Sequence, residues 1–205
     1  MMYENCTVAD IPKLMQGYDW SYCQLEDMTL REMANEMAYH LMREEGLPEG
    51  DKGFALLRLS DEMGYAPATY ALALCYYKGE FVKKDYKKSI EKMIKASTAE
   101  RPHPGSLLEM ARLYREGSST FKIEKDLAKS TDAYKKMTRV ENVHELVKYV
   151  DALQEAYDEL KDNKYIADAF RSVIKSMKWN AKDESVTSLL ASLQKKYGNP
   201  MRFYN

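Results

Sequence analysis

Apolar residues recur along the chain at intervals of three and four, the spacing that brings side chains to one face of an α-helix. Two runs show it best: Ala68, Leu72, Tyr76 and Gly79, and Leu107, Met110, Ala111 and Tyr114. Alternation at every second residue is hard to find, and the hairpin turns Asn-Gly and Asp-Gly do not occur. The pattern therefore predicts an all-α protein.

Cap residues and glycines mark the expected helix ends. The spacing of a capping box, a Ser, Thr or Asn with a Glu three residues later, occurs at Thr29 and Glu32, Ser106 and Glu109, and Asn142 and Glu145. A glycine just beyond an apolar run ends a helix in left-handed backbone, which we expect at Gly46, Gly64, Gly79 and Gly117. These signals predict helices over 30–44, 51–63, 67–78, 86–98, 106–116, 126–138, 143–160, 164–178 and 185–197. Short connections make neighbouring helices antiparallel.

The first 28 residues have a different pattern. Asp10 followed by Pro12 predicts an N-cap with Pro near the first helical position, and so a short helix through Met15. The aromatic stretch over 17–22 predicts a loop. We expect this segment to pack over the first helices as a lid.

Two stretches of the chain, 64–97 and 104–137, resemble each other. Five pairs match at an offset of 38 residues: Ala68 and Ser106, Leu72 and Met110, Ala73 and Ala111, Tyr76 and Tyr114, and Gly79 and Gly117. Two more pairs match at an offset of 41: Asp85 and Asp126, and Lys88 and Lys129. The extra three residues fall in the loop between the two predicted helices, where insertions are tolerated.

Each repeated residue type has a physical role in a helix pair. A small residue at Ala73 and Ala111 lets the two helices approach closely, and the glycine ends the first helix without steric cost. Asp85 and Asp126 cap the second helix at its positive end. Because one such pair cannot bury its own apolar face, it must stack on its neighbours.

This pattern resembles the Sel1-like repeat, a relative of the tetratricopeptide repeat, whose motif reads roughly Ala-x-x-x-Leu-Gly-x-x-Tyr-x-x-Gly. Residues 64–97 match it closely, with Ala73 in place of the helix Gly, and 104–137 match with a longer loop. The resemblance implies an α-solenoid of about eight to ten helices, with the first helix of each pair on the concave side. It also implies an adaptor or inhibitor role, because members of this family generally bind other proteins.

The repeats suggest three parts along the chain. Residues 1–28 form an N-terminal cap segment, and 29–141 hold Sel1-like repeats, namely a degenerate copy over 30–64 and copies over 64–103 and 104–141. Residues 142–205 form a C-terminal helix pair and a capping helix.

Composition and charge narrow the classes of function. Hydrophobic residues make up 45% and charged residues 31%, as in a folded protein, and the net charge is −1. Residues 1–62 carry 13 acidic and 5 basic side chains, whereas the remainder carries 19 and 26. Three cysteines without a Cys-x-x-Cys pair argue against a disulfide framework or a zinc site. We see no secretory signal and no apolar stretch long enough to span a membrane, and we expect a cytoplasmic protein.

The sequence carries none of the common catalytic motifs. There is no phosphate-binding loop, nucleophile elbow or His-Glu-x-x-His. We expect His40 to be a packing residue, His103 to be solvated and His144 to be exposed. The acid pairs at 44–45 and 61–62 end helices and are expected to face water, as is the lysine-rich stretch over 78–95. We therefore predict no catalytic residue, cofactor, metal or small-molecule substrate.

A few side chains on the first helices occupy positions that the repeat does not prescribe. Those in the two best copies are Tyr70, Leu74 and Tyr77, and their equivalents Leu108, Arg112 and Arg115. They form an aromatic and basic strip if first helices line the concave side, and Tyr and Arg are frequent interface anchors. The alternative is ordinary packing between repeats with a solvated edge.

The function predicted from these residues is a non-enzymatic protein-binding scaffold or inhibitor that acts through the concave face. One alternative is an immunity or anti-defence protein that blocks a specific partner enzyme. A second alternative is nucleic-acid binding through the basic C-terminal half.

Overall fold

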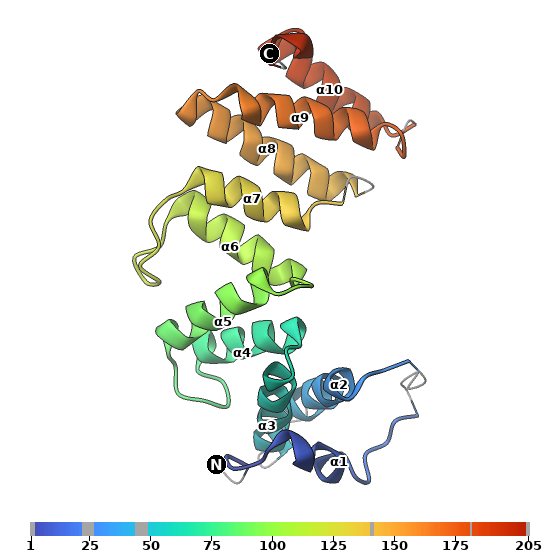
Figure 1. The fold of residues 1–205 in the computed structure, drawn as a ribbon, viewed down its shortest axis with the longest axis vertical. Coiled ribbons are helices and arrows are strands. Elements are labelled where there is room, and N and C mark those ends of the chain that lie inside the picture. Colours follow the sequence, from blue (N-terminus) through green and yellow to red (C-terminus); the bar gives the residue numbers. More distant parts are fainter. Residues whose placement is uncertain (1–2, 22–26, 44–48, 140–141, 181, 204–205) are drawn as a thin grey trace. The chain divides into compact units, whose positions relative to one another are not determined.

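The computed structural model describes residues 3–21, 27–43, 49–139, 142–180 and 182–203. Among these residues it contains ten α-helices and, as its β pairing, an isolated bridge between Ser118 and Ile123 (Figure 1). The helices are α1 (Ile11–Leu14), α2 (Leu30–Arg43), α3 (Glu49–Glu62), α4 (Ala66–Lys78), α5 (Tyr86–Thr98), α6 (Pro104–Glu116), α7 (Leu127–Met137), α8 (Val143–Leu160), α9 (Asn163–Ser176) and α10 (Glu184–Tyr197). The all-α prediction is confirmed.

Apart from the end of α2 and the start of α3, which adjoin residues outside the description, the boundaries predicted for the nine helices over 30–197 agree with the structure to within two residues. One start signal was wrong. Helix α6 begins at Pro104, so Ser106 lies in its first turn and is no cap; its hydroxyl donates a hydrogen bond to the carbonyl of His103 at 2.7 Å. Asn142 does cap α8, since its side chain accepts from the N–H of Glu145. Gly46 and the acid pair at 44–45 lie outside the described residues.

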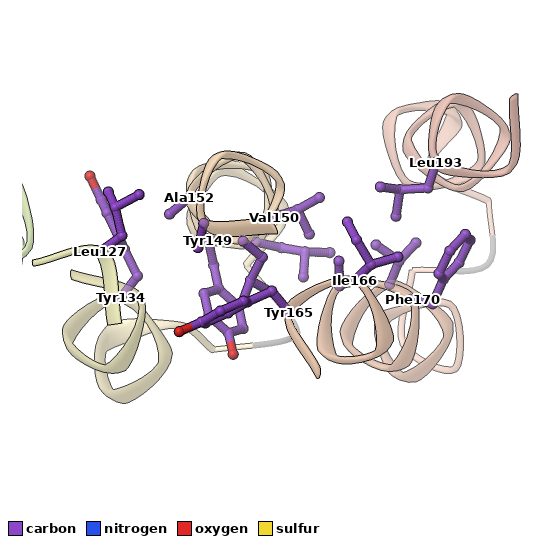
Figure 2. Close-up of a cluster of buried hydrophobic side chains, with 14 of the residues drawn as sticks. Leu127, Tyr134, Tyr149, Val150, Ala152, Tyr165, Ile166, Phe170 and Leu193 are labelled. Atoms are coloured by element: carbon purple, nitrogen blue, oxygen red, sulfur yellow. The ribbon is translucent and has the colours of Figure 1, made fainter. Parts of the chain in front are cut away.

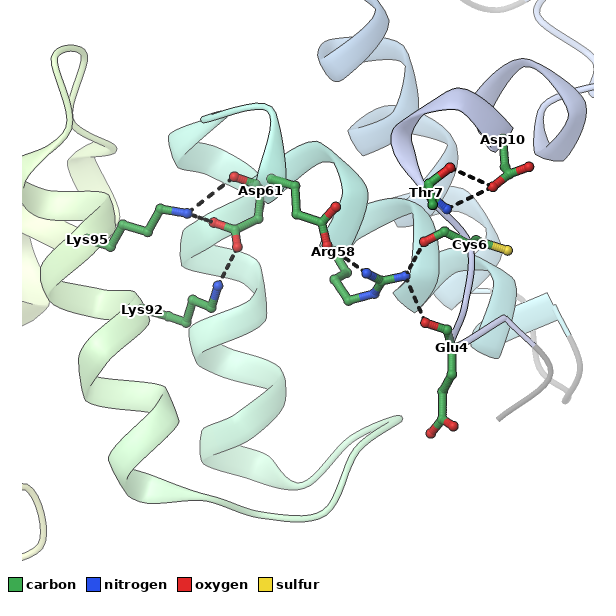
Figure 3. Close-up of polar contacts among 9 residues, drawn as sticks. Glu4, Cys6, Thr7, Asp10, Arg58, Asp61, Lys92 and Lys95 are labelled. Atoms are coloured by element: carbon green, nitrogen blue, oxygen red, sulfur yellow. Dashed lines mark hydrogen bonds and ion pairs between the residues drawn. The ribbon is translucent and has the colours of Figure 1, made fainter.

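The chain divides into two compact units, Met1–Ser106 and Leu107–Asn205. In the first unit, α2 packs on α3, α3 on α4 and α4 on α5. The N-terminal segment contacts α3, and Ile11 is fully buried in the core of this unit. The guanidinium of Arg58 fastens the segment to α3 by donating to the carbonyl oxygens of Cys6 at 2.7 Å and Glu4 at 3.3 Å (Figure 3).

The core of the second unit is centred on α8. This helix packs against α7 on one side and α9 on the other, and α10 packs on α9. Its buried face presents Leu146, Tyr149, Val150 and Leu153. Phe170 of α9 is fully buried in the same cluster and lies opposite Leu193 of α10 (Figure 2). Tertiary packing of these amphipathic faces stabilises the helices.

The small residues of the two repeat copies occupy the same environment. Ala73 and Ala111 are both fully buried. The hydroxyl of Ser89 donates to the carbonyl of Ala73 at 2.8 Å, and that of Ser130 donates to the carbonyl of Ala111 at 2.8 Å. A methyl side chain lets the partner helix approach closely enough for a serine to reach the backbone. This bond therefore joins the two helices of each pair in the same way.

The loops of the two pairs are closed by equivalent contacts despite their different lengths. Gly79 and Gly117 are left-handed, with φ of 81° and 75°. The N–H of Asp85 donates to the carbonyl of Tyr76 at 2.9 Å, and that of Asp126 donates to the carbonyl of Tyr114 at 2.7 Å. Both Asp side chains cap the following helix by accepting from a backbone N–H three residues on, at 3.0 and 2.9 Å.

Two lysines of the repeat lie over tyrosine rings. The ammonium of Lys88 lies 5.4 Å from the ring centre of Tyr76, and that of Lys129 lies 5.4 Å from that of Tyr114. Both are cation–π contacts within one helix pair. The equivalence of the two copies, inferred from spacing, thus extends to individual side-chain contacts.

Candidate functional site

The predicted binding residues of the first unit differ in accessibility. Tyr77 is 45% exposed and its ring lies 5.7 Å from that of Tyr86. Tyr70 is half-buried and stacks on His103 at 4.5 Å between ring centres, and Leu74 is also half-buried. Tyr77 is therefore the member of this group that offers the most surface to a partner.

The predicted binding residues of the second unit also divide. Leu108 packs partly buried against the core of the unit. Arg115 pairs with Glu155 of α8 at 2.5 Å, which ties α6 to the next helix pair. Arg112 has a side chain that is 52% exposed, and its ion pairs are with Glu109 and Glu116 of its own helix. That all six residues lie together in one strip on the concave face stays a prediction.

His103 is more enclosed than its loop position predicted. It is half-buried against the ring of Tyr70, and its Nδ1 atom is buried without a hydrogen-bond partner among the described residues. Burial lowers the pKa of His103. The imidazole therefore acts as a neutral packing group. His144 is exposed, as predicted.

Asp61 was expected to face water and does not. It is 2% exposed and accepts hydrogen bonds from Lys95 at 2.7 Å, from the hydroxyl of Thr69 at 2.6 Å, and from Lys92 (Figure 3). Burial alone would raise the pKa of Asp61, but the hydrogen bonds from Lys92, Lys95 and Thr69 outweigh it and hold the pKa below its ordinary value.

This cluster also corrects the reading of the lysine-rich stretch as wholly solvated. Lys92 and Lys95 reach from α5 to the end of α3, and Thr69 lies in α4 between them. The carboxylate of Asp61 thus joins α3, α4 and α5, and we call this contact the buried clamp. Because its oxygens already accept hydrogen bonds from three side chains, Asp61 is a poor candidate for proton transfer.

A polar cavity of about 350 Å³ lies in the first unit, lined by Arg31, Glu32, Tyr65 and Arg101 among others. Two of these side chains already have intramolecular roles. The carboxylate of Glu32 accepts from the N–H and hydroxyl of Thr29, and the guanidinium of Arg31 lies 5.7 Å from the ring centre of Tyr65.

A groove in the second unit runs between α7 and α9, with α8 beneath it. It consists of two adjoining cavities of about 290 and 310 Å³ that share Lys135, Tyr149 and Asp168. We call it the α7–α9 groove. One cavity adds Arg171 and Lys175, and the other adds apolar and aromatic side chains including Leu153 and Tyr165.

Sequence reasoning missed the α7–α9 groove, although part of its signal is visible. Lys164, Asp168, Arg171 and Lys175 follow one another at intervals of four, three and four, which places four charged side chains along one face of α9. Their apposition to Lys135 of α7 depends on how α8 separates the two helices, and spacing along the chain does not report this.

Within the described residues, no three His, Cys, Asp or Glu side chains are placed to share a metal ion. None of the helices in that part of the chain combines the length and the apolar character that crossing a bilayer requires.

Comparison with known proteins identifies the fold. No protein-family model matches the chain, and neither does any curated protein. Among solved structures, the chain is similar to a Sel1 repeat protein from Oxalobacter formigenes, with a TM-score of 0.59 and 17% identity, over 96% of this chain and 81% of that one. It is also similar to a protective antigen of uropathogenic Escherichia coli strains that has an SLR fold, with a TM-score of 0.50 and 17% identity, over 96% of this chain and 45% of that one.

The class of protein follows from these observations. The chain is an all-α solenoid of stacked helix pairs with the Sel1-like repeat fold, as the resemblance to that repeat implied. At 17% identity the likeness concerns the fold, so function must be argued from the surfaces of this chain.

Proposed function

We propose that this chain is a non-enzymatic protein-binding module, a scaffold or an inhibitor, that engages its partner through first-helix side chains. The observation that carries the proposal is a difference between two sets of residues in the repeats. Residues that recur in both copies make contacts that hold the helix pairs together. Tyr77 and Arg112 occupy positions that the repeat does not prescribe, and both are exposed. An exposed Tyr and an exposed Arg are typical of interface anchors.

Affinity capture from the native cell, followed by mass spectrometry, tests the proposal. Tyr77→Ala and Arg112→Ala should each weaken binding of the captured protein by about tenfold, the usual cost of losing an anchor residue. Trp179→Ala is the matched control, because Trp179 is 67% exposed and lies outside the first helices. Helical circular dichroism should stay unchanged in all three. Equal binding by the wild type and both variants would refute the first-helix surface.

A scaffold and an inhibitor are separated by what happens to the captured partner. If the partner is an enzyme whose activity falls when the chain binds, the immunity or anti-defence form of the proposal is supported. If the partner keeps its activity and a third protein is recruited, the scaffold form is supported.

Nucleic-acid binding through the basic half is the weaker candidate. Several of the lysines that suggested it have partners within the fold: Lys92 and Lys95 bond Asp61, and Lys88 and Lys129 lie over tyrosine rings. Affinity for an oligonucleotide that falls steeply with salt would favour this candidate instead.

A further inference from the structure

The α7–α9 groove is lined by a tyrosine hydroxyl that has no hydrogen-bond partner among the described residues. Tyr149 is 3% exposed and lines both cavities, yet its hydroxyl makes no hydrogen bond to any residue that the structure describes. Asp168, the acid that lines both cavities with Tyr149, is already held by Lys135 at 3.1 Å and by Arg171. Burial and the charges of Asp168 and Asp132 raise the pKa of Tyr149, so the phenol remains a donor. A ligand oxygen that reaches this hydroxyl can replace water and accept its hydrogen bond.

The charges around the Tyr149 hydroxyl determine which kind of ligand oxygen the cavity favours. The cavity beside it is lined by three cations, Lys135, Arg171 and Lys175, and one carboxylate, Asp168. Lys175 has no acidic partner among the described residues. The excess of positive charge favours an anionic group over a neutral one.

The other end of the groove has a different character. Its second cavity is floored by Leu153, 2% exposed, and Tyr165, 5% exposed. Its cation Lys164 is paired with Asp162, and its acid Asp132 is paired with Lys136. Each of these charges is therefore paired within the fold, and the floor of this cavity is aromatic and aliphatic.

The length of the groove suits an extended chain. From Lys164 to Lys175 the helix α9 rises by about 16 Å at roughly 1.5 Å per residue. An extended peptide covers that distance in about five residues. A peptide of this length could place an apolar side chain at one end of the groove and an acidic side chain at the other.

We propose that the α7–α9 groove binds an extended segment of a partner protein. An acidic side chain of that segment lies against Tyr149, Arg171 and Lys175, and an apolar side chain lies on Leu153 and Tyr165. The inference rests on the proposed function, since it takes the ligand to be a protein. It adds a second surface, on second helices, and the chemistry of what that surface accepts.

The test uses the full chain and a fluorescein-labelled peptide, Gly-Phe-Leu-Ser-Ser-Glu-Glu-Gly, with binding followed by anisotropy and by ¹H–¹⁵N chemical shifts. A twin peptide with Lys in place of Glu controls for charge. We expect the acidic peptide to bind at least about tenfold more tightly than its twin and to shift amides of α7 and α9, because the groove is net positive. Absence of binding up to about 1 mM, a limit of about −4 kcal/mol, or equal binding of both peptides, overturns the inference.

Variants separate the groove from general surface charge. Lys175→Glu should weaken binding of the acidic peptide by about tenfold. The matched control, Lys178→Glu, has the same charge change at an exposed residue that does not line the groove, and should have a smaller effect. Tyr149→Phe should weaken binding several-fold and leave the fold unchanged, because the lost hydroxyl makes no hydrogen bond to any described residue. Equal losses for Lys175→Glu and Lys178→Glu would overturn a local site.

Other occupants are distinguishable. Tighter binding of a short oligonucleotide than of the acidic peptide, or dimers that Lys175→Glu abolishes, would overturn the inference in favour of nucleic acid or a second copy of the chain. If a captured native partner loses affinity with Tyr77→Ala but not with Lys175→Glu, the groove inference fails while the proposed function stands. If no protein partner is captured and the acidic peptide does not bind, both fail.

Discussion

Replacing the buried carboxylate of Asp61 should destabilise the first unit measurably. Asp61→Asn keeps the shape of the side chain and one acceptor oxygen for Thr69, but it removes the charge that Lys92 and Lys95 approach. The amide nitrogen of the new side chain is a donor that would face the ammonium group of Lys92, which bonds the other carboxylate oxygen of Asp61. The variant thus removes a charge pair with little change in volume.

The magnitude follows from how far the partners are exposed. Removing one member of a fully buried ion pair costs about 3–5 kcal/mol, because the other charge is left uncompensated in the interior. Here the side chains of Lys92 and Lys95 are 28% and 51% exposed, so both ammonium groups can turn towards water. We therefore expect a loss of about 2 kcal/mol in the free energy of unfolding.

Urea denaturation followed by circular dichroism measures this loss, and its pH dependence identifies the cause. The pKa of Asp61 is lower in the folded chain than the ordinary value of 3.8. The charge therefore contributes its full stabilisation above that value and loses it as the pH falls through the lower folded-state pKa. The wild type and Asp61→Asn should differ most at about pH 7 and converge in acid.

The control is the neighbouring acid. Glu62 pairs with Arg58 at 2.6 Å on the surface of the same helix, and its side chain is 44% exposed. Glu62→Gln should cost less than about 1 kcal/mol, as surface ion pairs do. Equal losses for the two variants, or a difference for Asp61→Asn that does not shrink in acid, would refute the buried-clamp interpretation.

Further predictions concern the repeat itself. Gly79→Val should lower the free energy of unfolding by about 2 kcal/mol. The backbone at residue 79 has a φ of 81°, which is strained for a residue with a side chain, and an added Cβ would lie 3.1 Å from the Cβ of Lys84. Gly64→Val, at φ 77° with open space around it, should cost less by thermal denaturation, and the reverse order would contradict the cap geometry. Ser89→Ala and Ser130→Ala should each lower the free energy of unfolding by about 1 kcal/mol. The two losses should be similar, since each variant removes an equivalent buried hydrogen bond. Clearly unequal losses in urea unfolding would show that the two pairs are not joined alike.

The helices were predictable because their signals are local. A glycine after an apolar run and an Asp before the next helix act within a few residues, and the structure confirms both at Gly79 and Asp85. The prediction that Ser106 caps a helix was wrong for an equally local reason. Pro104 suits a first helical position, so the helix begins before the serine, whose hydroxyl bonds the backbone of the preceding turn.

The surroundings of individual polar residues were not predictable. Asp61 is paired with side chains 31 and 34 residues away, and His103 stacks on Tyr70. Such pairings depend on how helices stack, which is decided by the whole core. The same holds for Tyr149, a core residue by its burial, whose hydroxyl lines the groove between two helices.

The contacts that close each helix pair have a consequence for engineering the protein. The loop after Gly79 and the longer loop after Gly117 both return to the same bond, from the N–H of an aspartate to the carbonyl of a tyrosine. The pair is thus fastened at the base of the loop, and the length of chain above that point is not dictated by the fold. An epitope tag or a fluorescent reporter inserted between Ser119 and Thr120 would extend a loop that already differs between copies. The loop would then serve as a handle for labelling the chain while its helices remain paired.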